Sequence, residues 1–101
     1  MNANRKLTSI IKGRTVSSVV QQPETNALEI TFSDNSKMHV KTSGQAAAES
    51  LKSGGTISRI QQEGTILRLV GADDTSADIA LQAATSSVML RDKDNKLEYA
   101  D

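Results

Sequence analysis

Apolar and polar residues alternate with a period of two over several segments of this chain. Leu28, Ile30 and Phe32 are separated by single polar residues, and the segments 37–41 and 78–81 have the same pattern. This period is typical of β-strands that bury one face only. Asp and Asn residues lie between the segments and favour hairpin turns, because both tolerate a positive φ. The pattern therefore predicts antiparallel strands joined by short turns.

Two short segments have a helical period instead. Leu7, Ile10 and Ile11 recur at the spacing of one helix face, and Asn4 precedes them as an N-cap. A second helix is expected at 45–52. Both are shorter than an isolated helix needs in water, so they must pack against the sheet to be stable.

The chain also resembles itself. Residues 13–21 match 54–62 at an offset of 41 residues, and downstream the offset falls to 39. We therefore expect two related halves, 4–42 and 45–82, each made of a short helix followed by three strands. A hairpin at 86–101 follows the second half and has no counterpart after the first.

One irregularity occurs in both halves. Val16 and Val19, and likewise Ile57 and Ile60, are apolar residues three positions apart. Two such residues cannot face the same side of a regular strand. A β-bulge, or partial burial of both faces, would resolve this conflict.

The composition fits one small domain. The chain has 101 residues, no cysteine and two aromatic residues, Phe32 and Tyr99, so its core must be mostly aliphatic. We expect a single domain over 1–101 of mainly β structure with two short helices, in the α+β class. Its eight strands would form an antiparallel sheet closed as a small barrel or folded as a sandwich.

The charge is unevenly distributed although the net charge is zero. Residues 1–14 carry four basic side chains and no acidic one, whereas residues 73–101 carry seven acidic side chains and three basic ones. The two ends of the chain can therefore attract each other, either within one molecule or between molecules.

No residue pattern predicts a catalytic, cofactor or metal site. His39 is the only histidine and lies in a predicted strand, where a solvated position accounts for it. Asp73, Asp74 and Asp78 could bind a divalent cation, but the first two fall in a predicted turn. The segment 92–95 lacks the ligand spacing of a calcium loop. We expect no enzyme and no cofactor, and a metal-dependent enzyme with an acidic site remains the weakest alternative.

Some apolar and amide residues have no place in the predicted core. Ile66, Val70 and Met89 fall on the side of their strands away from it, and Gln21 and Gln61 lie near strand ends. A helix could cover the apolar residues. Otherwise these five residues form an interface with a partner subunit.

The sequence thus predicts a non-enzymatic binding or assembly module that associates with itself as a homo-oligomer. The alternative is a small inhibitor or accessory protein that docks on a larger protein partner. Nucleic acid is not an expected partner, because two aromatic residues offer no stacking platform and the chain is neutral. No segment has the apolar length of a membrane span or of a signal peptide, so we expect no membrane partner and a cytoplasmic location.

Overall fold

The computed structural model describes residues 2–22, 24–43 and 55–101. In this part of the chain the elements are β1 (Asn2–Ala3), α1 (Arg5–Ile11), β2 (Val16–Gln22), β3 (Ala27–Phe32), β4 (Lys37–Lys41), β5 (Ile57–Glu63), β6 (Ile66–Gly71), β7 (Ser76–Ala80), β8 (Val88–Arg91) and β9 (Leu97–Ala100). The chain is therefore mainly β, with one short helix among the described residues. The second helix, expected at 45–52, lies outside them. The short strand β1 was not expected.

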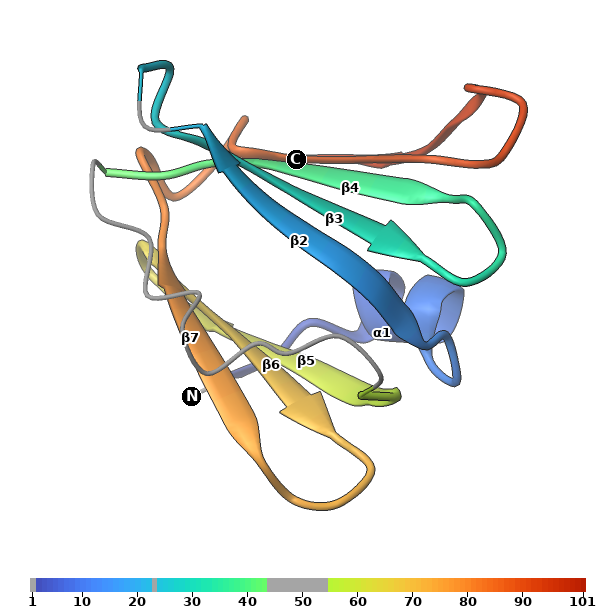
Figure 1. Cartoon of the computed structure of the whole chain (residues 1–101). Helices are drawn as coiled ribbons and strands as arrows, with labels where there is room; N and C mark the ends of the chain where they lie inside the picture. Colours follow the sequence, from blue (N-terminus) through green and yellow to red (C-terminus); the bar gives the residue numbers. More distant parts are fainter. Residues whose placement is uncertain (1, 23, 44–54) are drawn as a thin grey trace.

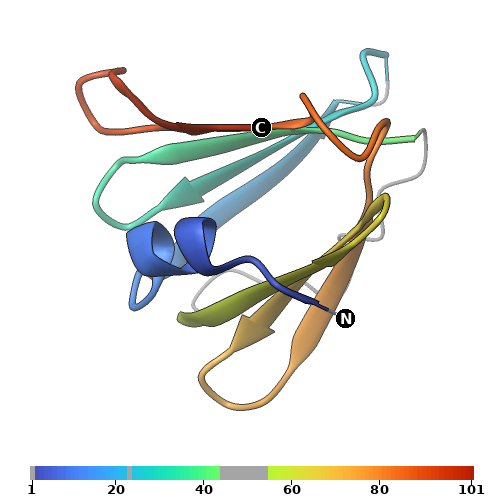
Figure 2. The same cartoon turned by 180° about the vertical axis from the view of Figure 1, so that it is seen from behind.

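The strands form two antiparallel sheets, with the orders β1-β5-β6-β7 and β2-β3-β4-β8-β9. The sheets face each other and splay apart on one side, where α1 lies between them (Figures 1 and 2). Among the described residues they are joined by two isolated bridges, Thr15 with Thr56 and Thr42 with Leu81. Single bridges do not continue a ladder from one sheet into the next, so the expectation of a closed barrel is wrong. The architecture is an open sandwich.

Both bridges join residues that match each other in the sequence repeat, at the offsets of 41 and 39. The hydrogen bonds around the first bridge are reciprocal. The amide of Val16 donates to the carbonyl of Gly55 at 2.8 Å, and the amide of Ile57 donates to the carbonyl of Arg14 at 2.9 Å. The chain segments of the two sheets therefore meet about an approximate two-fold axis.

The irregular strands contain the bulges that the sequence suggested. In β2 the pairing register shifts between Val16 and Ser18. In β5 it shifts at the equivalent place, between Ile57 and Arg59. As a result Val16, Ile57 and Ile60 are buried, and Val19 packs against the core. A bulge lets two apolar residues three positions apart face the same side.

The helix closes the open side of the sandwich. Asn4 caps α1 through its Oδ1, which accepts a hydrogen bond from the amide of Leu7 at 3.1 Å. Leu7 and Ile11 are fully buried in the common core with Phe32, the largest of the fully buried side chains described. Full burial of an aliphatic side chain of this size contributes about 1.5–3 kcal/mol, which is how so short a helix stays formed.

Candidate functional site

The side of the five-stranded sheet that faces away from the core, here called the outer face, contains a continuous row of side chains. The register places Val20 beside Glu29, Glu29 beside His39, His39 beside Met89 and Met89 beside Ala100. Cross-strand partners point to the same side of a sheet. One row therefore crosses all five strands and carries apolar, acidic and basic groups in turn.

Exposed large apolar side chains are concentrated on the outer face. Among the described residues they are Val20, Met89 and Leu97, with 49%, 37% and 54% of their surface exposed. Val20 and Met89 belong to the row, and Leu97 pairs with Arg91 next to it. Single exposed apolar residues are normal on protein surfaces, but several on one face mark a contact surface.

The outer face is also basic. Lys37, Lys41 and Arg91 lie on it, and the carboxylate of Glu29 lies among them. Glu29 is 3.6 Å from both the Nζ of Lys37 and the Nδ1 of His39, which is too far for a hydrogen bond. No carboxylate of the described residues forms an ion pair with Lys41. Most of the positive charge on this face is therefore open to an outside partner.

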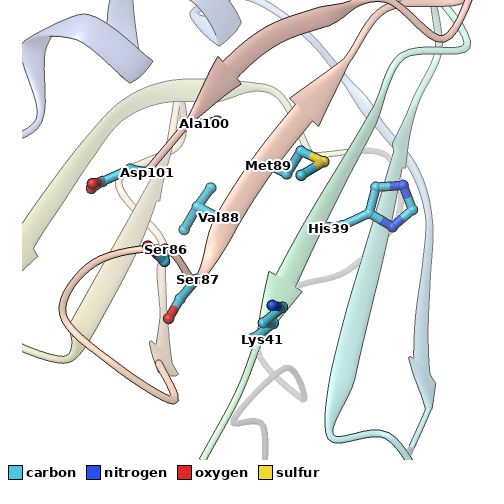
Figure 3. Close-up of a pocket in the computed structure, with 8 residues that line it drawn as sticks. All are labelled: His39, Lys41, Ser86, Ser87, Val88, Met89, Ala100 and Asp101. Atoms are coloured by element: carbon cyan, nitrogen blue, oxygen red, sulfur yellow. The ribbon is translucent and has the colours of Figure 1, made fainter.

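A groove of about 620 Å³ runs along β8 at one end of the outer face. His39 and Lys41 line one side of it, Ala100 and Asp101 line the other, and Met89 lies between them (Figure 3). The hollow exists because the side chain beside Met89 on β9 is only a methyl group. The groove is therefore basic on the β4 side and apolar in the middle.

The loop before β8 supports the groove. The Ser87 hydroxyl donates to the carbonyl of Ala83 at 2.8 Å and accepts from its amide at 3.1 Å. Ser87 is buried, and Ser86, which also lines the groove, has a positive φ of 62°. A loop held by reciprocal hydrogen bonds does not have to be ordered when a ligand binds, which lowers the cost of binding.

The outer side of the four-stranded sheet differs in its electrostatics. Arg68 and Asp78 match Glu29 and His39 at the offset of 39, but the acid and the base have changed places. Arg68 binds Asp78 through two hydrogen bonds of 2.6 and 2.9 Å. These hydrogen bonds lower the pKa of Asp78 below its ordinary value. The central charges of this sheet are thus paired within the chain.

The five residues expected to form an interface do not lie on one surface. Ile66, Val70 and Gln61 are on the four-stranded sheet, Met89 is on the five-stranded sheet, and Gln21 lies opposite a core residue in the β2–β3 ladder. Val70 is only 4% exposed and Ile66 is half-buried. The described helix α1 lies between the two sheets and therefore does not cover Ile66 or Val70 (Figure 2). Of the five, only Met89 lies on the outer face described above.

Sequence reasoning missed Val20 and Leu97. Val20 follows the bulge of β2, which turns Val19 toward the core and Val20 away from it. Placing the bulge at Ser17 would have predicted this exposure from the sequence. Leu97 begins a four-residue strand that contains its own irregularity, so a simple alternation could not assign its side.

Asp73 and the acidic segment 92–95, which were considered for metal binding, support turns, whereas Asp78 binds Arg68. The Oδ1 of Asp73 accepts hydrogen bonds from the amide and hydroxyl of Thr75 at 3.2 and 2.6 Å, and these bonds lower the pKa of Asp73. The Oδ1 of Asp92 accepts from the amides of Asp94 and Lys96, each at 2.9 Å. Within residues 2–22, 24–43 and 55–101 no three His, Cys, Asp or Glu side chains gather as metal ligands would.

The two oppositely charged ends of the chain meet within the molecule. Arg14 binds the two carboxylate oxygens of Glu98 at 2.8 and 3.0 Å, and its Nε lies 3.5 Å from Asp34. The hydrogen bond with Glu98 raises the pKa of Arg14. Lys6 lies over the ring of Tyr99, with its Nζ 5.9 Å from the centroid. Part of the charge asymmetry therefore stabilises the fold itself.

No protein-family model, curated protein or solved structure matches the chain. The described residues contain no helix with the length and apolar character needed to span a bilayer.

Proposed function

We propose that this chain is a non-enzymatic binding module that docks on a protein partner through the outer face of the five-stranded sheet. One observation carries the proposal: Val20, Met89 and Leu97, the large apolar side chains exposed among the described residues, all lie on this face. Apolar residues surrounded by polar ones supply most of the affinity of typical protein interfaces. We include a cytoplasmic location in the same proposal. The sequence has no cysteine and therefore no disulfide bond, and disulfide bonds are the feature that would point to an oxidising compartment.

The charge of the outer face favours a partner that is not a second copy. In a two-fold dimer the patch faces a second copy of itself, so the basic residues Lys37, Lys41 and Arg91 would meet a surface with the same excess of positive charge. Like charges brought together across an interface are repulsive. An acidic partner surface with apolar residues is complementary instead. This supports the role of a small inhibitor or accessory protein over self-association.

Protein is also favoured over nucleic acid as the partner. Phe32 and Tyr99 are the only aromatic residues in the sequence, and both are buried in the core. Surfaces that bind single-stranded nucleic acid usually stack bases on exposed aromatic rings. Basic residues bind the carboxylates of a protein without needing aromatic rings beside them.

The proposal is tested by selecting displayed random peptides on the whole chain. The selected peptides are then measured against a triple variant, Val20→Ser, Met89→Ser and Leu97→Ser. Ile66→Ser on the other sheet is the matched control, because it also removes a partly exposed aliphatic side chain. Circular dichroism confirms that each variant is folded. The three changes of the triple variant are at exposed positions, where a single substitution changes stability by about 0.5 kcal/mol or less.

We expect the peptides to bind the wild type and Ile66→Ser with equal affinity and the triple variant at least ten-fold more weakly. Equal affinity for the triple variant would contradict the proposal, as would a loss confined to Ile66→Ser. Failure to select any binding peptide would also count against a protein-binding role.

A further inference from the structure

We infer that the groove along β8 binds an extended acidic segment of the partner protein, with an apolar side chain over Met89 and a carboxylate next to Lys41 and His39. The inference rests on the proposed function and adds the chemistry of the partner. It assigns a location to the contact, since the groove occupies one end of the outer face.

The middle of the groove fits an aliphatic side chain. Met89 has His39 as its cross-strand neighbour on β4 and Ala100 as its neighbour on β9. The imidazole ring is large and the methyl group is small, so space is left on the Ala100 side of Met89. The methyl group of Ala100 leaves the hollow that a leucine-sized side chain would fill. Met is flexible and polarisable and adapts to the shape of an apolar partner. An anchor of this kind in a shaped pocket is typical of the residues that dominate protein interfaces.

The charges around the groove set the direction of the bound segment. Lys41 is exposed and has no ion-pair partner among the described residues, and His39 is only loosely paired with Glu29 at 3.6 Å. Asp101 pairs with the buried Val88 through reciprocal backbone hydrogen bonds of 3.0 and 2.9 Å, so its side chain lies on the core side of the sheet and does not face the groove. A partner carboxylate is therefore attracted toward β4. The acidic residue of the partner therefore lies on the β4 side, with its apolar neighbour between the two sides.

The partner surface must be acidic for a second reason. Lys37 and Arg91 extend the positive charge of the outer face beyond the groove along β4 and β8. A segment that leaves the groove in this direction passes both residues, so further carboxylates on it would also be attracted. Such long-range attraction raises the rate of association and weakens as salt is added.

The test uses nuclear magnetic resonance of the isotope-labelled whole chain with two synthetic peptides. One alternates leucine with glutamate, and the other alternates leucine with lysine. We expect the glutamate peptide to shift the amide signals of His39, Lys41, Met89 and Ala100, and the lysine peptide to bind at least ten-fold more weakly. Binding of the glutamate peptide should weaken between low and physiological salt.

Two variants locate the contact. Ala100→Trp fills the groove and should weaken binding of the glutamate peptide at least ten-fold, whereas Ala72→Trp, at another exposed alanine in the β6–β7 turn, should leave it unchanged. Lys41→Glu reverses the exposed charge without touching the core and should weaken binding by a similar factor. Retention of the dispersed amide spectrum shows that each variant is folded.

Several results would overturn the inference. Equal binding of the lysine peptide would remove the acidic specificity, and full binding to both Ala100→Trp and Lys41→Glu would place the contact elsewhere. Shifts confined to β2 around Val20 would refute the groove but leave the outer face, and hence the proposed function, intact. Displacement of the peptide by a thymidine oligonucleotide at lower concentration would point to a nucleic-acid ligand and refute both.

Discussion

Removing the contact between Arg14 and Glu98 should destabilise the fold more than removing any other ion pair described here. Arg14 precedes β2 and Glu98 lies in β9, the two edge strands of the five-stranded sheet. The guanidinium also donates to the hydroxyl of Ser36 at 3.0 Å and lies near Asp34 in the β3–β4 turn. One side chain thus ties both edges of the sheet to the turn between its central strands.

The size of the effect follows from the geometry and burial of the pair. The two hydrogen bonds are bidentate, and the side chains of Arg14 and Glu98 are 18% and 25% exposed. Exposed ion pairs contribute about 0.2–1 kcal/mol, whereas hydrogen bonds to charged groups contribute about 1.5–3 kcal/mol. A half-buried pair lies between these limits, so we expect a coupling free energy of about 1–2 kcal/mol. In a domain of this size each kcal/mol lowers Tm by about 4–8 °C.

The assay is a double-mutant cycle with Arg14→Met, Glu98→Gln and the double variant, followed by urea unfolding. Methionine retains the apolar stem of Arg14, and Lys12→Met is the control because Lys12 is exposed and forms none of the described ion pairs. The coupling should decrease only modestly at 1 M salt, because burial shields the pair from screening. A coupling free energy below about 0.3 kcal/mol would refute the reasoning, since it would place the pair among exposed ones.

Three further outcomes are expected. The pKa of Asp34 is lowered, because hydrogen bonds from Ser36 outweigh the opposing effect of burial, and the pKa of Asp73 is lowered by Thr75. The unfolded chain therefore binds more protons in acid, and stability is lost as the pH falls below about 4. The double variant Asp34→Asn and Asp73→Asn should make the slope of unfolding free energy against pH shallower there, and an unchanged slope would exclude these groups as its cause. Gly13 has a φ of +89° and open space where a Cβ would lie, so Gly13→Ala should cost about 1–2 kcal/mol in urea unfolding through backbone strain alone; no loss would show that the backbone relaxes. Gel filtration with light scattering at tens of micromolar should give the mass of a monomer, whereas a stable dimer would favour the self-association expected from the sequence.

Local physics made the strands and their turns predictable. The apolar residues of each alternating segment are buried, and the turn residues Asn35 and Asp74 have positive φ values of 70° and 66°. The paired irregularities at Val16 and Ile57 indicated bulges because they conflict with a period that the rest of the chain obeys. In each case the information lies within a few neighbouring residues. A common origin of the two halves by duplication remains a prediction, although the reciprocal bridges support it.

Features that depend on distant parts of the chain were not predictable. Glu98 lies 84 residues after Arg14, and charge alone did not identify it among seven acidic residues in the last third. The two-residue strand β1 has no period of its own and exists because Asn2 and Ala3 pair with β5. The candidate site depends on such arrangements too. Met89 and Ala100 border each other only because the β8–β9 hairpin adds to the edge of β4.

The difference between the two halves explains why the outer face of the five-stranded sheet is the better candidate for function. Equivalent positions carry an acid and a base in both halves, so both halves could have neutralised their central charges. In the second half Arg68 and Asp78 do so through hydrogen bonds of 2.6 and 2.9 Å. In the first half Glu29 and His39 stay 3.6 Å apart, and the added hairpin places further apolar and basic residues beside them. A surface selected only for stability and solubility gains nothing from this arrangement, whereas loosely paired polar side chains next to exposed apolar groups lower the cost of exchanging internal contacts for those of a partner.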